Sequence, residues 1–105
     1  MSNGFEQISP EEAKEIMDEQ VDVAILDIRT EQEYEDGHIE GAILMPLNEI
    51  EFAAENELED YDQTILVYCN SGKRSKIASA ILADLGYTNV YEFGGIIDWP
   101  YDIER

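Results

Sequence analysis

The sequence of 105 residues contains one cysteine, Cys69, and one histidine, His38. A lone cysteine cannot form a disulfide within the chain, and these two residues together cannot supply the ligands of a zinc module. No run of about 18 apolar residues is present, so no membrane span is expected. The start, Met1-Ser2-Asn3-Gly4, lacks the basic and apolar segments of a secretion signal. We therefore expect a cytoplasmic protein with no metal, no cofactor and no disulfide.

Basic residues are scarce as well: 6 lysines and arginines face 25 acids, and the net charge is −19. Such a charge repels nucleic acid and anionic membranes, so neither is expected as a partner. It is typical of a solvated and highly soluble surface, such as one adapted to salt, and the alternative is a surface for a dedicated cationic partner. The bases are unevenly distributed. Residues 63–83 hold three bases and no acid, a charge of +3, whereas the other 84 residues carry −22. Cys69 lies in this positive window.

Hydrophobic residues make up 44 % of the chain, enough for one modest core and one domain spanning residues 1–105. Apolar or β-branched runs predict strands at residues 23–27, 64–68 and 89–93, and residues 42–45 form another short apolar segment that Pro46 ends. Helices are predicted after Ser9 and Thr30, in one or two pieces over residues 47–61, over residues 74–85, and as a turn at residues 96–99. The alternation of strands and helices predicts an α/β fold, a mostly parallel sheet with helices on both faces.

Local signals refine these boundaries. Ser9 and Thr30 each begin a capping box, and Gly37 is expected to end the second helix in a left-handed conformation. Gly86 is expected to end the helix of residues 74–85, and Gly94-Gly95 to form a turn. The buried stripe expected for the helix of residues 74–85 is Ile77, Ala78, Ile81, Leu82 and Leu85.

Cys69 follows the strongest predicted strand and precedes a helix, and ligands of open parallel sheets bind at such strand ends. A loop that curls round the sulfur would direct backbone amides and the positive helix end towards it, which favours the thiolate. Lys73 and Arg74 would add to this effect, and Gly72 supplies a positive φ or a close backbone approach. The plain alternatives are a buried structural cysteine and, for Lys73, Arg74 and Lys76, an exposed helix face.

Three segments in one order carry a family resemblance. They are LDIRTEQEYEDGHIEGA at residues 26–42 with Pro46 after it, CNSGKRS at residues 69–75, and GGIIDW at residues 94–99. Together they resemble the two signatures and the active-site loop of rhodanese-like domains. The resemblance covers about residues 5–100 and implies a single domain with about five mostly parallel strands and helices on both faces.

The resemblance implies a sulfurtransferase. In this family the loop cysteine takes sulfane sulfur from a donor such as thiosulfate, holds it as a persulfide, and passes it to a thiol or cyanide. Cys69 would be the nucleophile, with a pKa below the usual value of about 8.5. Arg74 and Lys73 would offset the charge on departing sulfite. The loop expected to bind the donor comprises Asn70, Ser71, Gly72, Lys73, Arg74 and Ser75.

Two other functions stay open. Cysteine phosphatases and arsenate reductases share this type of loop, but the related phosphatases separate cysteine and arginine by five residues, whereas four separate Cys69 and Arg74. The shorter loop suits a compact sulfur donor better than phosphate, and no second cysteine is present to resolve an arsenate intermediate. The second alternative is a sulfur carrier or docking module that accepts persulfide from a basic relay protein, which the acidic surface would attract.

Supporting roles are expected for residues outside the loop. Asp27 and Arg29 match the Asp-x-Arg of the family and are expected to form a structural hydrogen-bond network near the site. The resemblance suggests that His38 fastens loops through its ring nitrogens and does not serve as an acid or base. Trp99 is expected to pack in the core.

Overall fold

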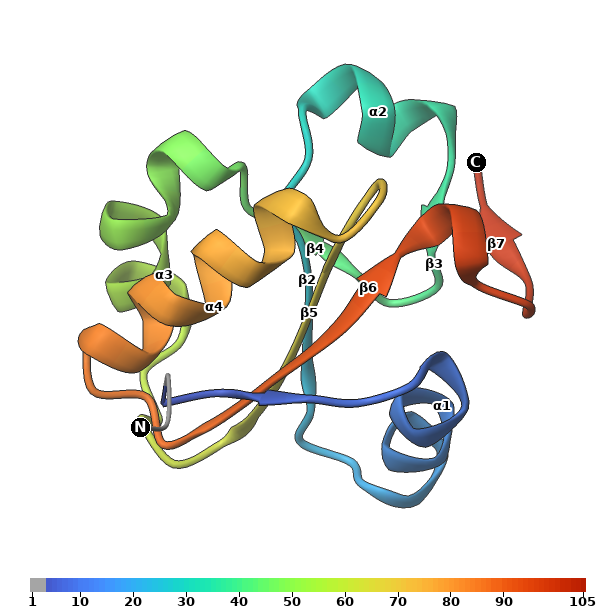
Figure 1. Ribbon diagram of the computed structural model, residues 1–105. Helices are drawn as coiled ribbons and strands as arrows, with labels where there is room; N and C mark the ends of the chain where they lie inside the picture. Colours follow the sequence, from blue (N-terminus) through green and yellow to red (C-terminus); the bar gives the residue numbers. More distant parts are fainter. Residues whose placement is uncertain (1–3) are drawn as a thin grey trace.

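The computed structural model describes residues 4–105, so residues 1–3 of the start considered above lie outside it. Five parallel strands form one sheet in the order β1-β6-β5-β2-β4 (Figure 1). The elements are β1 (Glu6–Gln7), α1 (Pro10–Glu19), β2 (Ala24–Asp27), α2 (Glu31–Asp36), β3 (His38–Ile39), β4 (Ile43–Leu44), η1 (Leu47–Glu49), α3 (Ile50–Glu57), β5 (Thr64–Cys69), α4 (Lys73–Asp84), β6 (Asn89–Gly95), η2 (Ile96–Asp98) and β7 (Ile103–Glu104). The predicted α/β class with a parallel sheet is confirmed.

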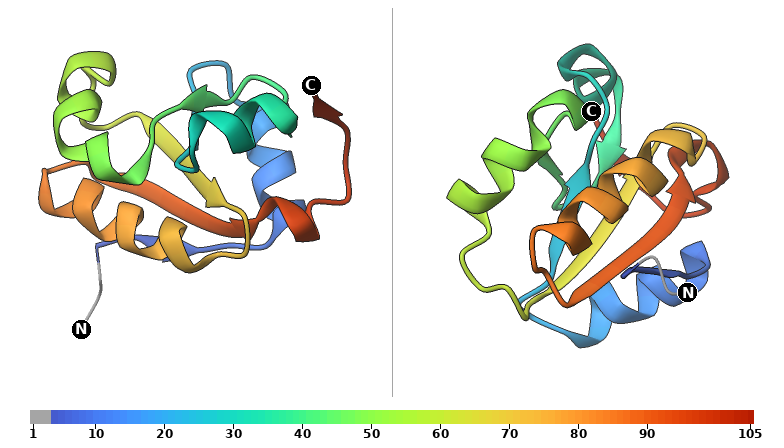
Figure 2. Two further views of the ribbon diagram at one scale, coloured as in Figure 1. Left: turned by 90° about the horizontal axis from the view of Figure 1, so that it is seen from above. Right: turned by 60° about the vertical axis from the view of Figure 1, so that its left-hand side comes forward.

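Strand β5 lies between β2 and β6, and its side chains alternate between two hydrophobic clusters. One cluster joins the sheet to α3 and α4, and the other joins it to α1. Figures 1 and 2 show α3 and α4 along one face, α1 on the opposite face, and α2 beyond the carboxyl ends of the strands. Because both faces are covered, β5 can carry apolar side chains on both of its faces, as its sequence indicated. Cys69, its last residue, faces the α4 side.

The two predicted capping boxes are present. The Ser9 and Thr30 hydroxyls accept from the amides of Glu12 and Glu33, and the carboxylates of these glutamates accept from the amides of Ser9 and Thr30. Gly37 is the C-cap of α2, as expected, but the predicted left-handed conformation was wrong, because its φ of 157° and ψ of 134° lie outside that region. The chain runs directly from α2 into β3 there, and the Gly37 carbonyl accepts a hydrogen bond from Arg29 at 2.7 Å.

The predicted stripe of α4 was wrong at Ile77, whose side chain is 54 % exposed. The helix turns Ser75, Ala78, Ser79 and Leu82 towards the sheet, a spacing of three and four residues that includes two small polar side chains. Ser75 is required on this face by its hydrogen bonds next to Cys69, and this rotates Ile77 towards solvent.

Gly94-Gly95 was also misassigned, because both glycines belong to β6. Val67 is opposite Glu92 and Cys69 is opposite Gly95, so β6 contains one extra residue at this point. Such irregularities redirect side chains near strand ends. Gly94 accommodates the extra residue with a φ of 93°.

A second sheet of two strands, β3 and β7, joins the segment after α2 to the last residues of the chain. His38 is opposite Glu104, and Ile39 is opposite Ile103. Within residues 4–105, none of the helices has the length and apolar character needed to cross a bilayer.

Candidate active site

Cys69 ends the central strand at the carboxyl edge of the sheet, and three residues separate it from the first turn of α4. Its Sγ atom accepts a hydrogen bond from the Gly72 amide at 3.0 Å, and the backbone of Arg74 and Ser75 in the first turn of α4 also lowers its pKa. The Ser75 hydroxyl lies 3.4 Å from the same sulfur. The sulfur therefore lies in a cradle of backbone donors at the amino end of a twelve-residue helix.

Gly72 makes this cradle possible. Its φ of 102° is left-handed, a conformation in which other residues are strained, and it directs the Gly72 amide back towards the sulfur. Gly95 has a different role. A Cβ atom there would lie 2.0 Å from the Asn70 carbonyl oxygen, so only glycine lets β6 approach the loop.

The cradle changes the acidity of Cys69. Burial, the largest influence, opposes ionisation, since Cys69 is only 1 % exposed. The hydrogen bonds from Ser75, Gly72 and Arg74 outweigh burial and lower the pKa of the Cys69 thiol below its ordinary value. The geometry is thus that of an ionisable thiol and not of an inert core cysteine.

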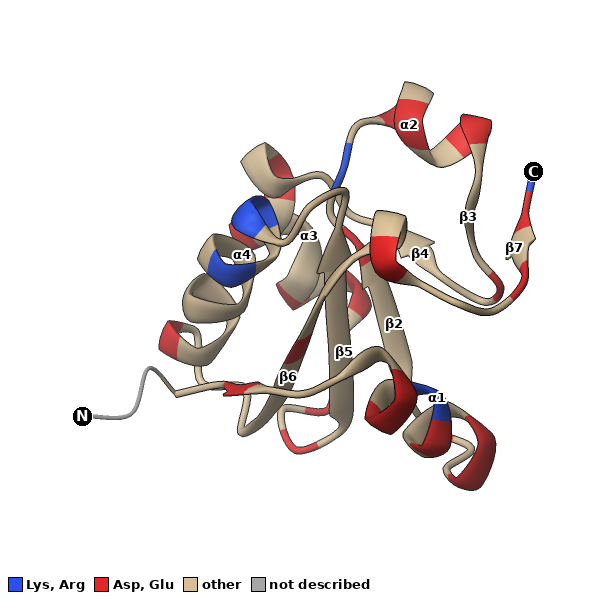
Figure 3. Cartoon of the chain, turned by 45° about the vertical axis from the view of Figure 1, so that its right-hand side comes forward, with Lys and Arg blue, Asp and Glu red and all other residues tan. Residues whose placement is uncertain are grey.

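The positive window of the sequence is only partly free in the structure. Arg74 forms a two-pronged ion pair with Glu33 of α2, with both nitrogen–oxygen distances at 2.9 Å. Lys76 donates to the Gly72 carbonyl at 3.1 Å and lies 3.8 Å from Glu92. The side chain of Lys73 is exposed at the start of α4. Figure 3 shows blue at this end of α4 and red over much of α1 and α2.

The remaining loop residues, Asn70 and Ser71, are exposed. The Asn70 carbonyl accepts from the Ile97 amide at 3.3 Å, which links the loop to η2. Ser75, by contrast, is fully buried, so its hydroxyl contacts the Cys69 sulfur and other buried groups and not solvent. Of the seven loop residues selected from the sequence, Cys69, Gly72, Arg74 and Ser75 meet around the sulfur through Sγ, hydroxyl or backbone atoms.

Asp27 and Arg29 form a buried ion pair beside the loop. Arg29 donates from Nε at 2.9 Å and from Nη2 at 2.6 Å to the two Asp27 oxygens. Tyr68 donates to Asp27 at 2.7 Å, and burial together with that bond raises the Tyr68 pKa above its ordinary value. The Tyr68 oxygen also accepts from the Ile39 amide at 3.0 Å. The network therefore fixes the ends of β2 and β5 and the start of β3.

His38 lies away from the sulfur cradle. Its ring stacks on Tyr34 with a centroid distance of 3.8 Å, and Nδ1 lies 2.9 Å from the Tyr34 carbonyl. Its Nε2 lies 3.7 Å from a Glu104 oxygen in β7. Trp99 packs against the cluster on the α1 side.

Glu92 was not selected from the sequence. It is 2 % exposed on β6, and its Oε2 lies 2.5 Å from the Ser75 hydroxyl and 2.8 Å from the Gly94 amide. The available signal was a single acid in an otherwise apolar strand just before the glycine pair.

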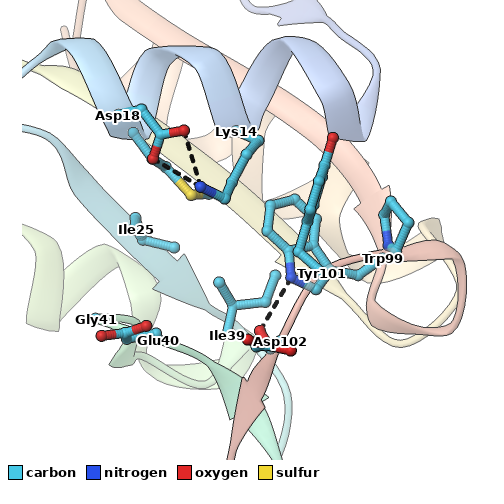
Figure 4. Close-up of a pocket in the computed structure, with 11 residues that line it drawn as sticks. Lys14, Asp18, Ile25, Ile39, Glu40, Gly41, Trp99, Tyr101 and Asp102 are labelled. Carbon is cyan, nitrogen blue, oxygen red and sulfur yellow. Dashed lines mark hydrogen bonds and ion pairs between the residues drawn. The ribbon is translucent and has the colours of Figure 1, made fainter.

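A cavity away from Cys69 lies on the other side of the sheet from α4. It has a volume of about 670 Å³ and lies between α1, the turn after β3 and the segment after η2 (Figure 4). Figure 4 shows Lys14 paired with Asp18 at one side and the rings of Trp99 and Tyr101 at the other. A hollow of about 410 Å³ lies nearer the loop, lined by Arg29, Leu47 and Arg74 among others. Within residues 4–105, no three His, Cys, Asp or Glu side chains form a group that could hold a metal ion.

Comparison with known families decides the ancestry of this fold and loop. A family model described as "Rhodanese-like domain" matches residues 9–100. The chain belongs to the rhodanese-like domain family. A solved structure entitled "rhodanese with anions from E. coli" superimposes on this rhodanese-like domain with a TM-score of 0.75 at 34 % identity, covering 79 % of this chain and 98 % of that one.

Two relatives of similar identity carry names for different functions, one a sulfurtransferase and the other a sulfur carrier. "Thiosulfate sulfurtransferase PspE" of Escherichia coli (strain K12) is 38 % identical over 73 residues, 70 % of each chain. "Putative sulfur carrier protein YrkF" of Bacillus subtilis (strain 168) is 36 % identical over 99 residues. That match covers 93 % of the present rhodanese-like domain and 52 % of the Bacillus protein, so the chain spans about half of that relative.

Proposed function

We propose that this protein is a sulfurtransferase that carries sulfane sulfur as a persulfide on Cys69. The Cys69 thiolate attacks the outer sulfur of thiosulfate, the sulfur–sulfur bond of the donor breaks, and its electron pair leaves with sulfite. Cyanide or a thiolate then attacks the outer sulfur of the persulfide, and the Cys69 thiolate is restored. No electrons are gained or lost overall, so the cycle needs no cofactor. A cytoplasmic setting, where a free thiol stays reduced, suits this chemistry.

One observation carries this proposal: the Cys69 sulfur accepts from the Gly72 amide at 3.0 Å and lies at the amino end of α4, whose first backbone amides lower its pKa. A structural cysteine needs no such donors, whereas a thiolate or persulfide anion does. The family membership and the name of the Escherichia coli relative support the same activity.

The charge on departing sulfite needs a cation near the loop mouth. Lys73 is exposed there and is available to an anion. Arg74 is held by Glu33, so we propose that it contributes its charge from within that ion pair. The exposed loop residues Asn70 and Ser71 complete the surface offered to the donor.

Intact mass spectrometry tests the proposal directly. The protein is incubated with thiosulfate, desalted and weighed, alongside the Cys69→Ser variant. We expect a gain of one sulfur mass in the parent, its loss on addition of cyanide, and no gain in the variant. An unchanged parent mass after incubation with both thiosulfate and a small persulfide would refute the proposal.

A second candidate is a carrier that receives persulfide from a basic partner protein. The net charge of −19 favours it, as does the sulfur carrier name of the Bacillus relative. The two candidates share the Cys69 persulfide and differ in the donor. A parent that is loaded by a persulfide-bearing protein and not by thiosulfate would favour the carrier.

A further inference from the structure

The Ser75 hydroxyl has one proton and several acceptors around it. Its oxygen lies 2.5 Å from Glu92 Oε2, 3.1 Å from the Gly72 carbonyl, and 3.4 Å from both the Gly94 carbonyl and the Cys69 sulfur. The carboxylate offers the shortest contact and the strongest acceptor, so the proton points to Glu92.

This direction has a consequence for Cys69. With its proton on the Glu92 side, the Ser75 oxygen presents lone pairs to the sulfur and accepts from the thiol. That arrangement fits the protonated thiol. The hydroxyl makes its contribution to the lowered Cys69 pKa only when it donates to the thiolate. To do so it must turn its proton away from Glu92, which leaves a buried carboxylate short of one donor.

Glu92 is held firmly in place. The Gly94 amide donates to Oε2 at 2.8 Å, and on the Oε1 side Gln7 of β1 donates at 3.5 Å and Lys76 of α4 lies at 3.8 Å. Other charged groups round the loop are the exposed Lys73, and Arg74, which is ion-paired with Glu33 of α2. Glu92 is therefore the buried negative charge connected to Cys69 through a hydroxyl.

We propose that Glu92 is a positioning residue for Cys69, because it takes the Ser75 hydroxyl proton and so restrains ionisation of the thiol. Only the biological use of this restraint rests on the proposed function. A thiol whose ionisation is restrained would still exchange sulfur, yet it would react more slowly with unwanted electrophiles. The thiol proton leaves to solvent when Cys69 ionises. Glu92 does not touch the reacting sulfur.

The test is the pH dependence of alkylation of Cys69, the only cysteine of the chain, by neutral iodoacetamide. Glu92→Gln removes the carboxylate that competes for the Ser75 proton, so the pH midpoint of alkylation should fall. At pH values below that midpoint, the alkylation rate should rise about threefold to tenfold. Glu6→Gln, the same change at an exposed position of β1, is the matched control and should leave the midpoint in place. An unchanged or higher midpoint in Glu92→Gln overturns the inference.

A second pair of variants separates the hydroxyl from simple charge repulsion. Glu92→Asp keeps the negative charge but withdraws it from Ser75, so it should lower the midpoint in the same direction as Glu92→Gln. If Glu92→Gln does not fold, the alkylation midpoint of Glu92→Asp still tests the inference. In the Ser75→Ala background, Glu92→Gln should change the rate by less than about twofold. A full effect without the hydroxyl, or none in Glu92→Asp, would mean that the charge acts through space and would refute the role of Ser75.

This experiment is independent of sulfur transfer. If the midpoints shift as expected while neither thiosulfate nor a small persulfide adds sulfur mass, the inference about Glu92 holds and the proposed function fails. If sulfur is loaded while the Glu92 variants titrate like the parent, the proposed function holds and the inference fails.

Discussion

At the scale of single residues, Gly72 offers a sharp test of the sulfur cradle. Gly72→Ala places a Cβ at a φ of 102°, which costs about 1–2 kcal/mol or moves the amide away from the sulfur. Either result weakens a hydrogen bond to the thiolate, so the Cys69 pKa should rise and the alkylation rate at neutral pH should fall several-fold. The measurement is the iodoacetamide rate against pH.

Gly41→Ala is the matched control, because Gly41 also has a positive φ, 84°, but lies in the turn between β3 and β4. It should cost similar stability without changing the alkylation midpoint. Equal midpoints in the two alanine variants would show that the Gly72 amide does not support the thiolate.

Residue by residue, the sequence was informative where the chemistry is local. The contact between Cys69 and Gly72 spans three residues, so the loop could be read directly from CNSGKRS. The contacts of Arg74 with Glu33 and of Ser75 with Glu92 span 41 and 17 residues. No local pattern encodes such pairings, and so the Glu33 partner of Arg74 was not predicted and Glu92 was overlooked.

At the scale of elements, the ion pair of Arg74 with Glu33 joins α4 to α2. The hydrogen bond to Arg74 is the main reason that the Glu33 pKa falls from an ordinary 4.5 to about 2. A carboxyl group whose pKa is lower in the folded state stabilises the protein at pH values above its pKa in the unfolded state. This stabilisation is lost as the pH falls through its pKa in the folded state. We expect Glu33→Gln to lower the free energy of unfolding by less than about 1 kcal/mol at neutral pH, since both side chains are about one-third exposed.

The difference between parent and Glu33→Gln should shrink as the pH falls from about 4.5 towards 2, as measured by urea unfolding at a series of pH values. Glu31→Gln, in the same turn of α2, controls for loss of helix charge. A destabilisation by Glu33→Gln that persists unchanged at the acid end would contradict this account.

The buried pair of Asp27 with Arg29 ties β2, β3 and β5 together more strongly. Asp27→Asn removes the carboxylate and leaves the Arg29 charge buried, so we expect a loss of about 3–5 kcal/mol in unfolding free energy. Asp18→Asn breaks the exposed pair with Lys14 and should cost less than about 1 kcal/mol. Similar urea midpoints for the two variants would show that the buried pair does not hold these strands.

The elements themselves were well predicted where short-range signals operate. Both capping boxes, the apolar strands and the helix after the cysteine loop follow from local sequence. Errors arose where a tertiary contact overrides the local signal. Arg29 binds the Gly37 carbonyl, Ser75 faces inward and rotates Ile77 to solvent, and an extra residue in β6 absorbs the glycine pair.

At the scale of the whole molecule, the net charge of −19 governs encounters with charged reactants. If thiosulfate is the donor, repulsion slows its approach, and added salt should raise the rate of Cys69 sulfuration by screening it. The iodoacetamide rate should not change with salt, because that reagent is neutral. A sulfuration rate that falls with salt, with a basic protein as donor, would identify the carrier function instead.

The near-complete enclosure of the sulfur also determines how two copies of this chain behave towards each other. An intermolecular disulfide needs two sulfurs about 2 Å apart, but each lies at the bottom of a loop with 1 % of its residue exposed. Two such recessed atoms cannot meet without opening both loops. Air oxidation should therefore leave the protein unlinked on a non-reducing gel, even though its one thiol is chemically active.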